Sequence, residues 1–343
     1  MTKTLGLALG SGGARGWAHI GVIRALQEAD VAISAIAGAS IGAFVGAIYA
    51  AGELDELEAL VRDLDWRSIV SYFDLVFPAS GLLDGNKVYE LLSEHLQNLC
   101  IEDASIPFCC IATDLITGQE VCLSHGSMAD AVRASISIPG IFTPFSKDST
   151  FLGDGGIVNP VPVDAIRRMG VDVVLAVNLN RPTATVDGSE TLESSARKAT
   201  DSQKSAEGED PSASDRSEDS PADDAEEKNR DRIALPDSAS SLIQRLRSRY
   251  EAMQETVQTK LEGWLPAEKS GPNIFDVIGI SLNVMEQRVT QSQLAQYPPD
   301  ILLEPTLCHY SIFDFHQAAD IIECGYQATQ QQLPALLQLL AAD

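Results

Sequence analysis

The chain has 343 residues, 45% of them hydrophobic, and a formal net charge of −25 at pH 7. This hydrophobic content is ordinary for a globular protein, and the length fits one large domain or two smaller ones. The acidic balance argues against nucleic acid as a main partner and against strong attraction to anionic membranes, since both need a basic face.

Six cysteines occur, but no C-x-x-C pair or Cys/His cluster has the spacing of a zinc site. We expect them to be buried, reduced thiols. The apolar run Leu5 to Leu9 near the N-terminus is interrupted by glycines and Arg15, so it does not predict a secretory signal. These observations favour a cytoplasmic protein, with peripheral contact at a membrane surface left open.

The first predicted strand, Thr4 to Leu9, is followed by a glycine-rich loop, Gly10 to Gly16, and by a helix through about Ala29. A dinucleotide-binding fingerprint would need glycine where Arg15 stands. A P-loop would need a Gly-Lys-Ser/Thr sequence, which does not follow.

An oxyanion hole is the third interpretation of this loop, and a plain structural turn is the fourth. The glycines would allow the backbone N–H groups of Gly12, Gly13 and Ala14 to turn inward without steric clashes. Among the functional interpretations, the oxyanion hole is the one whose sequence requirements the loop meets.

The second strand-turn-helix unit contains the sequence Gly38-Ala39-Ser40-Ile41-Gly42, which matches the G-x-S-x-G nucleophile elbow. It lies between a predicted strand, Ile33 to Ala37, and a predicted helix, Ile41 to Ala51. The alternative is a small-residue helix packed closely against a strand. In a parallel sheet both turns lie at the carboxyl edge, so we expect Ser40 beside the glycine loop.

The middle of the chain alternates helices with a hairpin. We predict helices at Asp55 to Leu64, Asn86 to Leu99 and Met128 to Ser137, a loop at Gly81 to Gly85, and a hairpin of Phe108 to Thr113 with Gln119 to Leu123. The aromatic stretch Trp66 to Pro78 is interpreted as a core helix or as a lid or acyl-chain channel.

Asp154 follows a short predicted strand, Thr150 to Leu152, and is flanked by glycines. The sequence Asp-Gly-Gly also fits an ordinary turn. A serine nucleophile needs a base, and two arrangements are open. Asp154 itself accepts the proton of Ser40, or Asp154 supports a histidine, His309 or His316, in a triad.

The second half of the chain contains an acidic segment poor in apolar residues. From about Arg181 to Asp237 we expect disorder, with an ordered acidic interaction tail as the alternative. Leu242 to Leu265 predicts a helix that is either part of the surface or active at a lipid interface. The remaining predictions are helices at Val163 to Met169, Ile274 to Arg288 and Phe313 to Gln330, strands at Val171 to Val177 and Asp300 to Leu303, and a short apolar stretch at Leu333 to Leu340.

Taken together, the glycine loop, the elbow and Asp154-Gly155-Gly156 resemble the patatin-like phospholipase family. The sequences Gly16 to Gly21 and Ser135 to Gly140 look like its bacterial branch. The resemblance covers Thr4 to about Asn180 and resumes over Pro272 to Gln330.

The resemblance implies an α/β fold, namely a three-layer α/β/α hydrolase with a mainly parallel central sheet. It implies a core at 1–180, the acidic insertion at 181–240 and completion of the same domain by 241–343. It also implies a serine hydrolase that cleaves lipid or other acyl esters without a metal or cofactor. A non-catalytic regulatory or interaction protein on the same fold is the rival hypothesis.

The implied site is a Ser–Asp dyad, with Ser40 as nucleophile and Asp154 as base. The implied oxyanion hole is Gly12, Gly13 and Ala14. The supporting motif residues are Arg15, Gly16, Gly38, Gly42, Gly155 and Gly156. The chain departs from the family pattern at Ser11, where the family's loop usually has glycine. The oligomeric state is left open.

Overall fold

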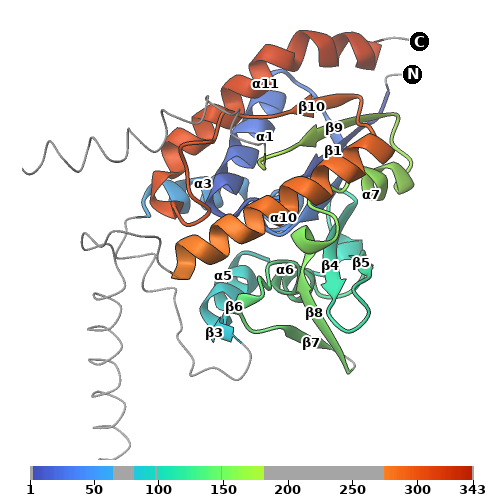
Figure 1. The fold of residues 1–343 in the computed structure, drawn as a ribbon. Coiled ribbons are helices and arrows are strands. Elements are labelled where there is room, and N and C mark those ends of the chain that lie inside the picture. The colour runs from blue at the N-terminus through green and yellow to red at the C-terminus, as the bar shows by residue number, and fades with distance from the viewer. Residues whose placement is uncertain (1–2, 65–80, 97–98, 148, 181–273, 342–343) are drawn as a thin grey trace, which may run out of the picture. The chain divides into compact units, whose positions relative to one another are not determined.

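The computed structural model describes residues 3–64, 81–96, 99–147, 149–180 and 274–341 (Figure 1). The described residues on both sides of the long gap belong to one compact unit. The predictions for Trp66 to Pro78, for the acidic segment and for Leu242 to Leu265 lie outside the described residues.

A mixed sheet of eight strands runs through the described part of the chain, in the order β10-β9-β1-β2-β4-β8-β7, with β5 also paired to β4. Its strands are β1 (Leu5–Leu9), β2 (Ile33–Ala39), β4 (Phe108–Asp114), β5 (Glu120–Leu123), β7 (Phe145–Lys147), β8 (Thr150–Asp154), β9 (Val173–Val177) and β10 (Ile301–Leu303). The five strands from β10 to β4 are parallel, while β5, β7 and β8 pair antiparallel. A separate parallel pair joins β3 (Gly81–Leu83) and β6 (Gly140–Phe142).

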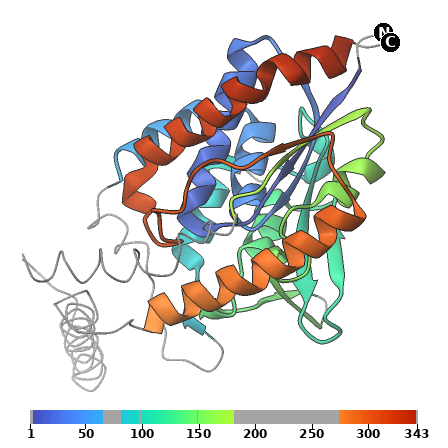
Figure 2. The same cartoon turned by 45° about the horizontal axis from the view of Figure 1, so that its top comes forward.

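Helices cover both faces of this sheet (Figures 1 and 2). The α-helices are α1 (Ala18–Glu28), α2 (Ile41–Ala51), α3 (Leu54–Arg62), α5 (Asn86–Leu96), α6 (Met128–Ser135), α7 (Val163–Arg168), α10 (Ile274–Gln296) and α11 (Ala318–Ala341). Short 3-10 helices are η1 (Gly13–Trp17), η2 (Ile101–Asp103), η3 (Gly155–Ile157) and η4 (Phe315–Gln317).

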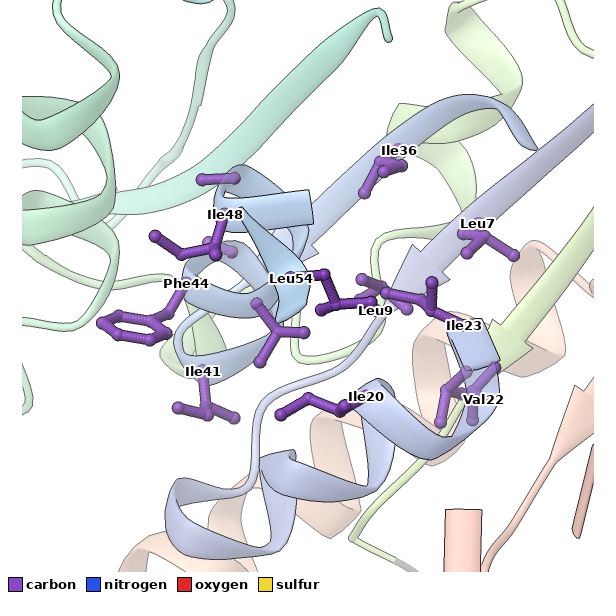
Figure 3. Packing of buried hydrophobic residues seen from close by; sticks show 14 of the residues in the cluster. Leu7, Leu9, Ile20, Val22, Ile23, Ile36, Ile41, Phe44, Ile48 and Leu54 are labelled. Carbon is purple, nitrogen blue, oxygen red and sulfur yellow. The ribbon is translucent and has the colours of Figure 1, made fainter. Parts of the chain in front are cut away.

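Alternation along β1 divides the core into two layers. Leu7 and Leu9 belong to the larger apolar cluster, with α1, α2, α3 and α11, whereas Ala8 belongs to a smaller one with α7 and Leu294 of α10. Figure 3 shows the side chains of Leu9, Ile23 and Leu54 gathered in the larger of these two clusters. Because successive strand residues point to opposite faces, both faces of β1 are buried. The predicted three-layer α/β/α fold is confirmed.

The structure differs from the predicted elements mainly in short strands and helix ends. The predicted loop Gly81 to Gly85 begins with β3, and neither β6 nor β7 was predicted, because three-residue strands carry too little periodicity. Helix α10 continues to Gln296, and Leu333 to Leu340 is part of α11 rather than a separate stretch. Helix α11 runs on through Pro334.

Candidate active site

Ser40 lies at the turn between β2 and α2 and has a strained backbone. Its φ of 53° and ψ of −122° lie outside the regions that non-glycine residues ordinarily occupy. Its N–H donates to Ser135 Oγ at 2.9 Å, and Ser135 Oγ donates to the carbonyl oxygen of Ile111 at 2.5 Å. The buried hydroxyl of Ser135 therefore ties the elbow to β4.

The two glycines of the elbow are required for close backbone packing. A Cβ on Gly42 would lie 2.1 Å from the carbonyl oxygen of Leu9, and one on Gly38 would lie 2.5 Å from the nitrogen of Ala43. Both neighbours are backbone atoms that cannot rotate away. The spacing G-x-S-x-G thus follows from the contact of the elbow with β1 and with its own helix.

Ser40 and Asp154 meet because β2 and β8 end against adjacent residues on one edge of β4. Ala39 pairs with Ile111, and Asp154 pairs with Ala112. Strand β5 covers the other edge of β4 at both positions, so β2 and β8 share an edge and point toward each other. The result is a hydrogen bond of 2.6 Å from Ser40 Oγ to Asp154 Oδ2.

The carboxyl group of Asp154 is buried and held by its neighbours. Its Oδ1 accepts a hydrogen bond from the N–H of Gly156 at 2.7 Å, and its backbone carbonyl accepts from Thr113 Oγ1 at 2.6 Å. Burial raises the pKa of Asp154 to about 7, although the hydrogen bonds from Ser40 and Gly156 favour the ionised form. Asp154 is therefore a stronger base than an exposed carboxylate.

The glycine-rich loop uses some of its N–H groups in backbone hydrogen bonds and leaves others without an acceptor among the described residues. Gly13 has a φ of 58°, and a Cβ there would lie 2.5 Å from the carbonyl oxygen of Ile312. That carbonyl already accepts the N–H of Ala14 at 2.9 Å, so this N–H is not free for an oxyanion. Ser11 likewise donates its N–H to Pro160 at 2.8 Å.

Gly12 and Gly13 are the remaining donors of the predicted oxyanion hole. No acceptor for either N–H is found among the residues that the structure describes. Both glycines and Ser40 line one cavity. The third predicted donor, Ala14, has its N–H bonded to Ile312, a loop residue 298 positions away that the sequence did not indicate as its partner.

Arg15 and Gly16 hold the loop in place. Arg15 is buried and donates to Gly12 O at 3.2 Å, to Asn180 Oδ1 at 2.9 Å and to Asn283 Oδ1 at 3.1 Å. A Cβ on Gly16 would lie 2.2 Å from the Ile41 side chain. Arg15 is thus a positioning residue whose fork of donors joins the loop to α10.

The histidines take no part in the contact between Ser40 and Asp154. His309 and His316 are exposed and line neither of the cavities that Ser40 lines. His19 is fully buried, and its Nε2 donates to the carbonyl oxygen of Gly10 at 2.8 Å. Burial lowers the pKa of His19 to about 4, so its ring is neutral and holds the loop.

Two cavities meet at Ser40. The first, of about 160 Å³, has an almost entirely apolar lining drawn from several helices, including Phe44, Leu57 and Leu91. The second, of about 400 Å³, lies beside α10 and is lined by Asp154 and by polar residues that the sequence reasoning missed, Asn283, Glu286 and Arg288.

Neither a metal site nor a membrane-spanning helix is found among the residues that the structure describes. In the described ranges, no group of three or more His, Cys, Asp or Glu side chains is arranged to hold a metal ion. None of the described helices combines the length and apolarity needed to cross a bilayer.

The fold and the turn at Ser40 define the class as a three-layer α/β protein with a nucleophile elbow. The family profile for patatin-like phospholipases matches residues 7–167. An uncharacterized NTE family protein of Mycobacterium tuberculosis is 33% identical over 96% of this chain and 91% of its own length. The human patatin-like phospholipase domain-containing protein 6 is 35% identical over 52% of this chain and 13% of its own.

The chain belongs to the patatin-like phospholipase family, and this membership supports lipid hydrolysis as its general activity. Among solved structures, VipD from Legionella pneumophila is similar with a TM-score of 0.40 and 16% identity, over 97% of this chain and 67% of that one.

Proposed function

We propose that the protein is a serine hydrolase of lipid acyl esters that works through a Ser40–Asp154 dyad. The observation that carries the proposal is the 2.6 Å hydrogen bond from Ser40 Oγ to Asp154 Oδ2 at a strained elbow. A nucleophile within hydrogen-bond reach of its base is the geometry that activation of a serine hydroxyl requires.

In the proposed reaction, Ser40 Oγ attacks the acyl carbonyl while Asp154 takes the hydroxyl proton. The carbonyl oxygen becomes an oxyanion, which the N–H groups of Gly12 and Gly13 stabilise, each worth a factor of about 10²–10³ in turnover. Collapse breaks the ester C–O bond, and the alcohol leaves with the proton from Asp154. Water then attacks the acyl-enzyme, Asp154 accepts its proton, and Ser40 is released with that proton.

The acyl chain is assigned to the apolar cavity, because Ser40 lines it together with hydrophobic side chains from α2, α3 and α5. Burial of each methylene group contributes about 0.8 kcal/mol, so a lipid chain binds there better than a short acyl group. A phospholipid, a lysophospholipid or a neutral lipid ester would all supply such a chain.

The test is hydrolysis of a panel of lipid esters by the purified full chain and by Ser40→Ala. We expect Ser40→Ala to fold normally and to lose hydrolysis, since it removes only the buried hydroxyl. Labelling with a fluorophosphonate probe should give a Ser40 adduct in the unaltered protein. A matched control is Ser281→Ala, an exposed serine of α10. Full activity in Ser40→Ala, or no adduct, would favour a non-catalytic interaction protein instead.

A further inference from the structure

Glu286 of α10 is a second carboxyl-bearing residue at the site, besides Asp154 of the proposed dyad. It lines the second cavity together with Ser40 and Asp154. Its Oε1 lies against Gly156, where an added Cβ would come within 2.5 Å of it. Since the N–H of Gly156 donates to Asp154, Glu286 lies directly beside the group that holds the proposed base.

The two cavities share Ser40, the proposed nucleophile, in their linings. The apolar cavity suits the acyl chain, so the alcohol part extends from Ser40 into the cavity beside α10. That cavity offers polar groups that can recognise hydroxyls, and Glu286 is among them.

We propose that this cavity is the alcohol subsite and that Glu286 hydrogen-bonds the oxygen of the leaving alcohol. The inference rests on the proposed function. In this role, Glu286 would favour the hydrolysis of esters of hydroxyl-bearing alkyl alcohols, such as glycerol. Esters whose leaving group needs no hydrogen-bond donor would gain less from it.

The charges around Glu286 favour its protonated form. Burial and, to a smaller extent, the negative charge of Asp154 together raise the pKa of Glu286 to about 8, against the opposing effects of Arg15 and of the hydrogen bonds from Ser11 and Asn180. Arg288 is the other charged residue that lines the cavity, and it is exposed. At neutral pH Glu286 therefore carries a proton next to an Asp154 that is partly ionised.

The proton of Glu286 is available to a ligand. Asn180 Nδ2 donates to Glu286 Oε2 at 2.8 Å, and the hydroxyl of Ser11 donates to the same carboxyl while accepting from Asn180 at 3.0 Å. The amide nitrogen of Asn180 is a donor only, so it does not take the acid proton. The residue that departs from the family pattern, Ser11, thus helps to orient Glu286.

The test compares two esters with the same acyl chain, a monoacylglycerol and a 4-nitrophenyl ester. The purified full chain is assayed beside Glu286→Ala, Glu286→Gln and the control Gln291→Ala, which alters an exposed residue of the same helix. We expect Glu286→Ala to lower kcat/KM for the glyceryl ester about tenfold or more, as loss of a hydrogen bond worth ~1.4 kcal/mol would. The aryl ester should lose less than about threefold, because nitrophenolate leaves without a donor.

Glu286→Gln should recover most of the loss, because its amide also donates. With the glyceryl ester, the unaltered protein should lose activity above about pH 8, as Glu286 ionises, and Glu286→Gln should not. Equal losses on both esters, or an alkaline decline that persists in Glu286→Gln, would overturn the inference and leave the dyad standing. Absence of Ser40-dependent hydrolysis in the unaltered protein would overturn both proposals.

Discussion

Replacement of Asp154 by asparagine should stabilise the fold at alkaline pH while it abolishes hydrolysis. Burial raises the pKa of Asp154 from 3.8 to about 7, so the folded protein favours the neutral acid. A group whose pKa is raised on folding makes its full contribution to the stability of the folded protein below its unfolded pKa. This contribution is lost as the pH rises through the folded pKa. The asparagine side chain of the variant would keep an oxygen for the N–H of Gly156 and would never ionise.

The magnitude follows from the two pKa values. Relative to a side chain that never ionises, linkage through Asp154 lowers the free energy of unfolding by about 2 kcal/mol at pH 5 and by about 4 kcal/mol at pH 8.5. The free energy of unfolding of Asp154→Asn, relative to the unaltered protein, should therefore rise by about 2–3 kcal/mol across this range. For a domain of this size, the Tm of Asp154→Asn minus the Tm of the unaltered protein should therefore increase by roughly 5–10 °C between pH 5 and pH 8.5.

The assay is thermal and denaturant unfolding of both proteins between pH 5 and pH 8.5. Asp30→Asn is a matched control, because Asp30 is exposed and its positive φ suits asparagine. A stability difference for Asp154→Asn that stays constant with pH would refute the reasoning, since it would mean that Asp154 ionises in the folded protein as easily as in the unfolded one.

Three further predictions concern the same site. Hydrolysis by the unaltered protein should fall about tenfold per pH unit below about pH 6, as Asp154 becomes protonated and cannot accept the proton of Ser40; a flat rate from pH 5 to pH 7 with intact fold would contradict this. Ser135→Ala should lower the free energy of unfolding by about 1–3 kcal/mol, because it leaves the buried Ser40 N–H without its partner, and denaturant unfolding measures the loss. The double variant His309→Ala with His316→Ala should change kcat/KM less than about twofold, and a dead variant in this assay would support the triad.

The sequence predicted the meeting of Ser40 with the glycine loop for a reason that the structure bears out. Strands β1 and β2 are neighbours and parallel, so the turns that follow them lie at one edge of the sheet. The same rule does not explain Asp154, because β8 is antiparallel to β4. Its approach to Ser40 depends on which edge of β4 each strand occupies, and local sequence does not encode that choice.

The sequence did not predict which N–H groups of the glycine-rich loop are free, or that α10 brings Glu286 to the site. The bond between Ala14 and Ile312 joins residues 298 positions apart, so glycine patterns alone could not separate free N–H groups from committed ones. Periodicity predicted the first part of α10 but could not say that Glu286 faces Gly156. Ser135 did lie in a stretch that resembles the family, and this was the available signal for its role.

Arg15 explains how a site that begins near residue 10 can include a helix beyond residue 273. Its guanidinium donates to Gly12, to Asn180 and to Asn283, which lie in the loop, after β9 and in α10. The chain on both sides of the gap between 180 and 274 is therefore bonded to the same buried cation. Because the fork fixes the direction of three bonds, it positions the proposed oxyanion donors and the Glu286 side of α10 together. The proposed alcohol subsite and the proposed oxyanion hole are then connected through the hydrogen bonds of Arg15 and Asn180, so we expect a substitution in one to alter the kinetic contribution of the other.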